Sequence, residues 1–301
     1  MPENQVVTVI GLGTMGWGAA LSLLRAGFKT QGVDLRPEVL DRFAALGGQS
    51  HTTPAAAAVA DVIFVFVVNA DQVRAVLFGP AGAVAAARPG TIFVLCVTMP
   101  PRDAISIAGE LAACGMASLD APVSGGAAKA LSGEMTIMAS GPDATFSAAA
   151  PALAAMSAKV FRLGDVAGIG SQVKMINQLL AGVHIAATAE ALVLAAGVGL
   201  DLRTVHEVIS QSAGASWMFQ NRGPHIIDGD YAPRSAVDIF VKDLAIVAGE
   251  AAGIGVPTPL TTAALALFAQ AQAAGLGRED DAAVAKVLAR AAGLQLPGDV
   301  G

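Results

Sequence analysis

Short runs of β-type residues alternate with Ala/Leu-rich segments of helix length through about residue 163 of this 301-residue chain. Several of these runs are apolar nearly throughout, which is typical of parallel strands buried on both faces of a sheet. Their alternation with crossover helices predicts an α/β fold, a Rossmann-like doubly wound parallel sheet over residues 1–163. The expected strands are 6–10, 29–33, 61–68, 91–97, 115–120 and 134–140.

From Gly164 onward the strand pattern stops, so residues 164–301 are expected to form an all-α second domain. It should begin with a helix of about 30 residues over 170–199, about 45 Å long at the standard rise. Polar residues, among them Lys174 and Glu190, interrupt this apolar segment. We therefore expect a helix buried on all sides, running between the domains or into a partner subunit, rather than a membrane span.

Composition narrows the possible partners and compartments. Hydrophobic residues make up 54% of the chain and charged residues 14%, and the net charge is −6. Without a Lys/Arg cluster, the sequence predicts neither a nucleic-acid partner nor an anionic membrane partner. No basic segment precedes the first apolar run, so no signal peptide is expected and a cytoplasmic location is favoured. Cys96 and Cys114 are expected to be buried free thiols, and the four scattered histidines predict no metal site.

The first predicted strand runs into a glycine-rich turn that opens a helix, "VTVIGLGTMGWG". Gly11, Gly13 and Gly16 have the G-x-G-x-x-G spacing. The first glycine permits the turn, the second lets a pyrophosphate approach the backbone, and the third lets the helix pack on the strand. The helix N-terminus then directs N–H groups at the phosphates. This context favours a dinucleotide-binding loop over the alternative, an ordinary structural turn.

Asp34 ends the second predicted strand in "GVDLRP". Its carboxylate can accept hydrogen bonds from both hydroxyls of an adenosine ribose and repels a 2′-phosphate, which favours NAD over NADP. Arg36 could instead tolerate that phosphate. The residues expected to bind NAD in this region are Gly11, Leu12, Gly13, Met15, Gly16, Asp34, Leu35 and Arg36.

Two later loops follow strands and should line the same crevice at the carboxyl ends of the sheet. The first contains Val68 and Asn69, and the second contains Thr98. Thr98 could present its hydroxyl to the cofactor, or it could cap the helix that the following prolines begin.

The stretch "DAPVSGGAAKALSGEMTIMASG" places Ser124, Gly125 and Gly126 after another strand. Bare N–H groups and one hydroxyl suit a carboxylate ligand. By itself, an ordinary glycine turn is the stronger interpretation of this motif.

Two lysines interrupt apolar helical segments further along. Lys174 and Asn177 lie three residues apart in "GDVAGIGSQVKMINQ", so they share one helical face. Desolvating an ammonium is costly, so Lys174 is either functional or extends to solvent. Lys242 precedes Asp243 in "FVKDLAIV", where a structural salt bridge is an equal alternative.

These motifs, in this order over nearly the whole chain, resemble the β-hydroxyacid dehydrogenase family, which includes 3-hydroxyisobutyrate dehydrogenase and tartronate semialdehyde reductase. The resemblance implies that Lys174 is catalytic and that Asn177 lies beside it at the substrate. It also implies that Ser124, Gly125 and Gly126 hold the substrate carboxylate, and that Thr98 and Lys242 lie near the nicotinamide. The family fold is a Rossmann-like domain followed by a helical domain, usually in homodimers or homotetramers.

Residues 214–222, 228–244 and 277–288 resemble the L-threonate dehydrogenase branch of that family. The implied activity is NAD-dependent oxidation of the 2-hydroxyl of a small sugar acid, with Gln220 and Asn221 as further candidate polar contacts. The alternatives are a 3-hydroxyisobutyrate dehydrogenase, a tartronate semialdehyde reductase, or a non-catalytic NAD-binding scaffold. Lys174 argues against the scaffold.

Overall fold

The structure of the protein is a computed structural model that describes residues 5–299. Its chain separates into two compact units that divide between Lys174 and Met175, inside one continuous helix. The domain boundary expected at residues 163/164 falls just before this helix and stays a prediction.

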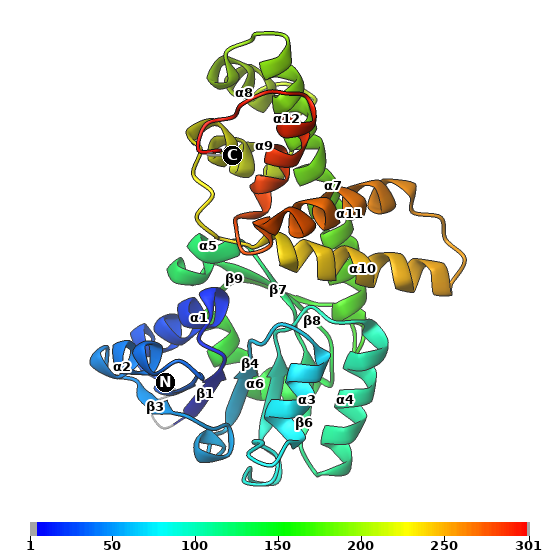
Figure 1. Cartoon of the computed structure of the whole chain (residues 1–301). Coiled ribbons are helices and arrows are strands. Elements are labelled where there is room, and N and C mark those ends of the chain that lie inside the picture. The colour runs from blue at the N-terminus through cyan, green and yellow to red at the C-terminus, as the bar shows by residue number, and fades with distance from the viewer. Residues whose placement is uncertain (1–4, 300–301) are drawn as a thin grey trace. The chain divides into compact units, whose positions relative to one another are not determined.

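Six parallel strands form the centre of the first unit (Figure 1). Their spatial order is β3-β2-β1-β4-β5-β6, so the direction of winding reverses between β1 and β4. At such a reversal, the carboxyl ends of the strands leave a crevice for a ligand. The strands are β1 Val6–Ile10, β2 Lys29–Val33, β3 Gln49–His51, β4 Val62–Val65, β5 Ile92–Leu95 and β6 Ala117–Asp120.

Helices cover both faces of this sheet, as its apolar strands require. On β4, Phe64 enters the core under one set of helices, whereas its neighbour Ile63 enters the core under the other. The first set is α1 Thr14–Arg25, α2 Pro37–Ala45 and α6 Asp143–Ala155, and the second is α3 Ala70–Phe78 and α4 Pro101–Ala113. The predicted doubly wound sheet is therefore confirmed.

The prediction that residues 134–140 belong to the parallel sheet is wrong. This run forms β8 Met135–Ala139 in a separate sheet, antiparallel to β7 Val123–Ser124 and parallel to β9 Ser157–Arg162. Only residues 125–134, which include the short α5 Gly126–Ser132, connect β7 to β8. A parallel crossover needs a connection of about a dozen residues or more, so this shorter one reverses the chain direction.

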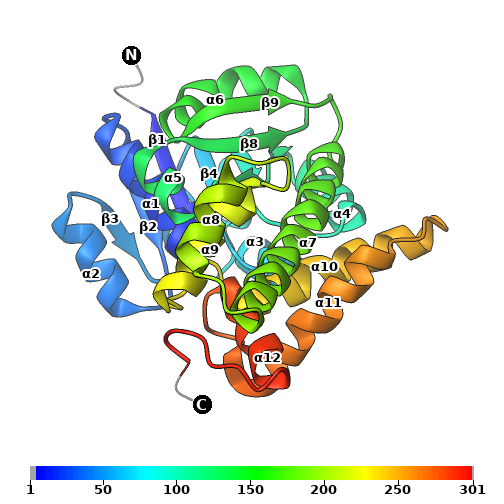
Figure 2. The same cartoon turned by 90° about the horizontal axis from the view of Figure 1, so that it is seen from above.

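The regular elements of the second unit, within the described residues, are helices, and a β-bridge joins Ala236 to Asp280. The predicted helical second domain is thus confirmed. Figure 2 shows α10 (Val237–Gly253) and α11 (Pro259–Ala271) side by side. Phe240 of α10 stacks on Phe268 of α11, with ring centroids 5.2 Å apart. The helices are α7 Ile169–Gly197, which begins in the first unit, α8 Leu202–Ser210, α9 Trp217–Asp228, α10 Val237–Gly253, α11 Pro259–Ala271 and α12 Val284–Ala291.

Helix α7 is long and apolar enough to cross a membrane by length and composition alone. However, Ile185, Ala189 and Leu192 are buried in the core of the second unit. Within its most apolar window, 44% of the residues are buried inside the protein. The helix is therefore a core helix, as its polar interruptions predicted. It is not buried on all sides, however, because Ile176, Leu180 and Leu194 are exposed.

Candidate active site

The glycine loop between β1 and α1 has the close backbone contacts that its sequence predicts. Gly11 has φ +93°, and a Cβ there would lie 2.2 Å from the Phe66 carbonyl oxygen. A Cβ on Gly16 would lie 1.9 Å from the Gly11 carbonyl oxygen. Gly13 precedes α1 without a side-chain cap, so the first N–H groups of the helix remain available to an anion. These residues fit the pyrophosphate of a dinucleotide.

Asp34 lies at the carboxyl end of β2, directly beside this loop. Its carboxylate accepts the Leu12 N–H at 2.9 Å and also binds Arg36 through the backbone N–H and the guanidinium. Burial raises the pKa of Asp34, but the hydrogen bonds from Arg36 and Leu12 outweigh it and leave the pKa below its ordinary value. Asp34 is thus a charged acceptor at the expected ribose position, and Arg36 already pairs with it.

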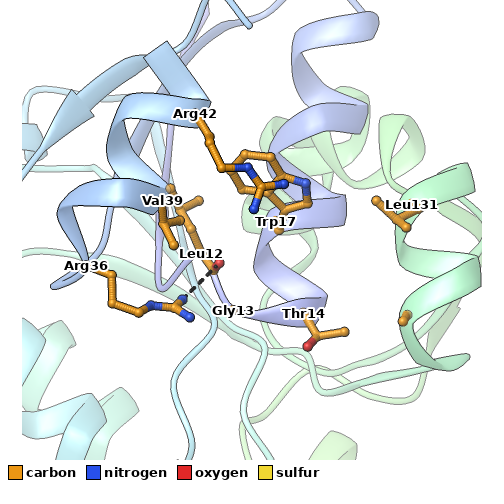
Figure 3. Close-up of a pocket in the computed structure, with 9 residues that line it drawn as sticks. Leu12, Gly13, Thr14, Trp17, Arg36, Val39, Arg42 and Leu131 are labelled. Atoms are coloured by element: carbon orange, nitrogen blue, oxygen red, sulfur yellow. Dashed lines mark hydrogen bonds between the residues drawn. The ribbon is translucent and has the colours of Figure 1, made fainter. Parts of the chain in front are cut away.

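A pocket opens beside the loop (Figure 3). Besides Arg36, it contains Trp17 and Arg42, which the motifs did not indicate. Arg36 donates to the Leu12 carbonyl oxygen at 3.3 Å, and Arg42 lies over the Trp17 ring at 4.8 Å from its centroid. The lining residues are Leu12, Gly13, Thr14, Trp17, Arg36, Val39, Arg42, Ala127 and Leu131. The two guanidinium groups give this pocket an anion-binding character next to the phosphate loop.

The other predicted cofactor residues of the first unit lie on loops, except Met15, which lies on a helix. Met15 is in the first turn of α1, where it packs against the core under α1 and α2. Leu35 is 92% exposed, and Val68 is also exposed, so both offer apolar surface that a bound ring could cover. Asn69 caps α3 by accepting the Gln72 N–H at 2.9 Å.

Thr98 lies between β5 and α4 and is half-buried. Helix α4 begins at Pro101 after Pro100, so Thr98 is not its N-cap residue. The structural alternative for Thr98 is therefore wrong, and its role at the cofactor stays a prediction.

The substrate-loop motif has a backbone that only glycine adopts readily. Gly125 has φ +129° and Gly126 has φ +71°, and α5 starts immediately after Gly125. Helix α5 packs closely on α1, because a Cβ on Gly18 would lie 2.4 Å from the Ala130 carbonyl carbon. The helix that follows Ser124 and Gly125 is thereby held against the helix that follows the cofactor loop.

Asp120, the first residue of the same motif, reaches the start of α7. It is 1% exposed and accepts the N–H groups of Gly168 at 2.9 Å and Ser171 at 2.8 Å. Its other oxygen accepts the Ser171 hydroxyl at 2.7 Å, and the Ser140 hydroxyl accepts the Gly170 N–H. Burial raises the pKa of Asp120 above its ordinary value despite these hydrogen bonds. The two motifs containing Ser124 and Lys174 are thus joined by one buried carboxylate.

Lys174 lies in the second turn of α7 and is buried, 7% exposed. It belongs to the first unit, whereas Asn177 and Lys242 belong to the second. Asn177 donates to Gln178, and Lys242 forms an ion pair with Asp243. The salt bridge expected as the structural alternative for Lys242 is present, and a cofactor role for this lysine stays a prediction.

Several further expectations concern residues outside these motifs. Gln220 donates to the Ser210 carbonyl oxygen at 3.0 Å, and Asn221 accepts from Arg222, so both make bonds within the second unit. Cys96 is buried but Cys114 is exposed, which corrects the expectation of two buried thiols. Among residues 5–299, no group of three or more His, Cys, Asp or Glu side chains could hold a metal ion.

Comparisons with known proteins cover nearly the whole chain. Residues 6–164 match the family model for the NAD binding domain of 6-phosphogluconate dehydrogenase. Residues 168–288 match a second family model, described as NAD-binding of NADP-dependent 3-hydroxyisobutyrate dehydrogenase. The L-threonate dehydrogenase of Cupriavidus necator is 54% identical over 97% of this chain and 98% of its own. The L-threonate dehydrogenase of Escherichia coli K12 is 50% identical over 97% of this chain and 96% of its own. A Salmonella typhimurium crystal structure described as 3-hydroxyisobutyrate dehydrogenase is 49% identical, with a TM-score of 0.90, covering 94% of this chain and 100% of its own.

Proposed function

This chain belongs to the 3-hydroxyisobutyrate dehydrogenase-like family of NAD(P)-dependent hydroxyacid oxidoreductases, and from that premise we propose that it oxidises L-threonate to 2-dehydro-L-erythronate with NAD. The observation that carries this proposal is identity of 50% or more, over nearly the full chain, to two L-threonate dehydrogenases. Ser124, Lys174 and Asn177, which the family resemblance places at the substrate, are present in this sequence.

In the proposed mechanism, Ser124 and the N–H groups of Gly125 and Gly126 bind the substrate carboxylate, because small residues leave this backbone accessible to an anion. Lys174, as a neutral amine, takes the proton of the 2-hydroxyl. NAD held at the glycine loop of Gly11, Gly13 and Gly16 would supply the acceptor for the hydride that leaves the same carbon. In the reverse direction the ammonium of Lys174 returns the proton to the oxygen. Asn177, one helical turn further along α7, contributes a polar contact to the substrate.

The preference for NAD over NADP rests on Asp34. Its charged carboxylate lies beside the glycine loop, where a ribose hydroxyl would meet it and a 2′-phosphate would be repelled. Arg36 opposes this preference because its guanidinium can leave Asp34 and bind a phosphate. Asp34 is the more constrained of the two, since its side chain is 9% exposed against 51% for Arg36.

The second candidate is a 3-hydroxy acid substrate, which the name of the Salmonella relative favours. The two reactions differ in their products. Oxidising a 3-hydroxyl places an aldehyde or ketone carbonyl β to the carboxylate, where it can promote loss of carbon dioxide, whereas oxidising a 2-hydroxyl does not. A cytoplasmic homodimer or homotetramer remains our proposal for the state of the protein.

The proposed function is tested with a panel of C3 and C4 hydroxy acids assayed for NADH and carbon dioxide formation. We expect turnover of L-threonate to exceed that of 3-hydroxyisobutyrate, with no carbon dioxide released. Faster turnover of 3-hydroxyisobutyrate would instead favour the second candidate, a 3-hydroxy acid substrate. Cofactor binding without turnover of any acid in either direction would leave the scaffold alternative.

A further inference from the structure

Four polar side chains of α7 and α10 form a continuous hydrogen-bonded chain within the second unit. Asn177 Nδ2 donates to Gln178 Oε1 at 2.9 Å, and Gln178 Nε2 donates to Asp243 Oδ2 at 2.5 Å. The ammonium of Lys242 donates to Asp243 Oδ1. Asp243 therefore connects Asn177 and Lys242, the two residues of this unit that the family motifs place at the active site.

The environment of Asp243 makes it an unexpected place for a charge. Asp243 is 2% exposed and Gln178 is 7% exposed. Beside them α7 and α10 pack tightly, because a Cβ on Gly182 would lie 2.7 Å from Leu244 Cδ2. Burying a carboxylate is costly, and a buried ion pair is often no more stable than apolar residues of the same size. Stability alone is therefore a weak reason for an acid here.

The chemistry of the carboxylate fixes the direction of the whole chain. An ionised carboxylate only accepts hydrogen bonds, so Gln178 must turn its amide nitrogen toward Asp243. The Gln178 oxygen then faces Asn177 and requires a donor, so Asn177 must turn its own amide nitrogen toward Gln178. Asn177 consequently keeps its carbonyl oxygen for a contact outside this chain of bonds.

We propose that Asp243 is a positioning residue that acts through Gln178 to make Asn177 present its amide oxygen as an acceptor for a substrate hydroxyl. This inference rests on the proposed function, in which Asn177 contacts a hydroxy acid. A site with an oriented acceptor discriminates against analogues that lack the matching hydroxyl, because the acceptor is then left unpaired. The expected consequence is selectivity for polyhydroxy acids over simple hydroxy acids.

The test compares L-threonate with 2-hydroxybutyrate, which keeps the chain length, carboxylate and 2-hydroxyl but lacks the other two hydroxyls. Asp243→Asn keeps the shape of the side chain but can donate to Gln178, so Gln178 and Asn177 are free to reverse. We expect the ratio of kcat/KM for the two acids to fall by about tenfold or more. Asp238→Asn is the matched control, since Asp238 is also on α10 and accepts from a glutamine, Gln272. It should leave the ratio unchanged.

The double variant Gln178→Glu/Asp243→Asn separates orientation from packing. The amide introduced at position 243 would donate to the carboxylate introduced at position 178, which accepts from Asn177 as Gln178 does now. The acid ratio should then recover to within about threefold of the unmodified protein. An unchanged ratio in Asp243→Asn, or a double variant no better than that single variant, would overturn the inference alone. An unmodified protein that turns over neither acid would overturn the proposed function and this inference with it.

Discussion

The carboxylate of Asp120 accepts the hydroxyl hydrogen of Ser171 at 2.7 Å and also the Ser171 backbone N–H at 2.8 Å. Asp120 ends β6, whereas Ser171 is in the first turn of α7, one turn before Lys174. The end of a sheet strand thus fixes the start of the helix that carries the proposed catalytic lysine.

We expect Asp120→Ala to lower turnover on the order of 10²-fold, because small displacements of a catalytic group have effects of that size. Loss of the cap should also cost about 1–2 kcal/mol of unfolding free energy. Asp120→Asn retains an acceptor for the two N–H groups and should recover most of the turnover. Steady-state kinetics below the melting temperature, with NAD binding measured separately, check this. Equal turnover in Asp120→Ala and the unmodified protein would show that α7 does not depend on this anchor.

Asp34 should decide the cofactor preference. Removing its charge with Asp34→Ser eliminates the repulsion of a 2′-phosphate and releases Arg36 to bind it. A charge interaction of about 1–3 kcal/mol predicts that the ratio of kcat/KM for NADP to that for NAD rises tenfold to a hundredfold. Asp41→Ser, on the exposed surface of α2, makes the same charge change and should leave the ratio as it is. An unmodified protein that uses NADP as well as NAD would refute the assignment to Asp34.

Gly18 and Gly109 should respond oppositely to alanine. A Cβ on Gly18 would lie 2.4 Å from the Ala130 carbonyl carbon, whereas nothing lies within 4 Å of a Cβ on Gly109. Gly18→Ala must separate α1 from α5 and should lower the unfolding free energy by about 1–3 kcal/mol. Gly109→Ala, in the exposed face of α4, should raise it by about 0.5–1 kcal/mol. Chemical denaturation measures both, and a stable Gly18→Ala protein would argue against this close packing.

Asp280 should stabilise the folded protein at pH values where its carboxyl group is ionised. Burial raises its pKa, but the hydrogen bond and charge of His225, with Arg222 and the Arg234 N–H, outweigh burial and hold the pKa below the ordinary 3.8. A carboxyl with a lowered pKa stabilises the fold above its unfolded-state pKa, and that contribution is lost as the pH falls through the folded-state value. The unfolding free energy of the unmodified protein should therefore fall more steeply below about pH 4 than that of Asp280→Asn. Parallel slopes would exclude this contribution.

The cofactor loop could be predicted from sequence because its signals are local. At Gly11 and Gly16 a side chain would clash with backbone atoms, whereas a Cβ on Gly13 would meet nothing within 4 Å. Asp34 could be predicted because it directly follows the second strand. The placement of 134–140 failed for a reason that the sequence also contains, since the connection from β7 is too short for a parallel crossover.

The hydrogen-bond partners of the site residues could not be predicted. Asp120 and Ser171 are 51 positions apart, and Gln178 and Asp243 are 65 apart. Nothing in either local pattern indicates the other residue, because these pairs form only when separate elements pack. For the same reason the motifs did not indicate Arg42, which faces the cofactor loop from α2.

The central claim is that Lys174 transfers the substrate proton, and turnover of Lys174 variants tests it most directly. Lys174→Ala removes the group, whereas Lys174→Arg keeps the charge but replaces it with a guanidinium that does not give up its proton. Lys159→Ala, on exposed β9, is the control. The account predicts that both Lys174 variants lose on the order of 10² to 10⁴ in kcat with little change in NAD affinity, and that the control stays active. Near-normal turnover by Lys174→Ala would contradict it and make Lys242 the next candidate.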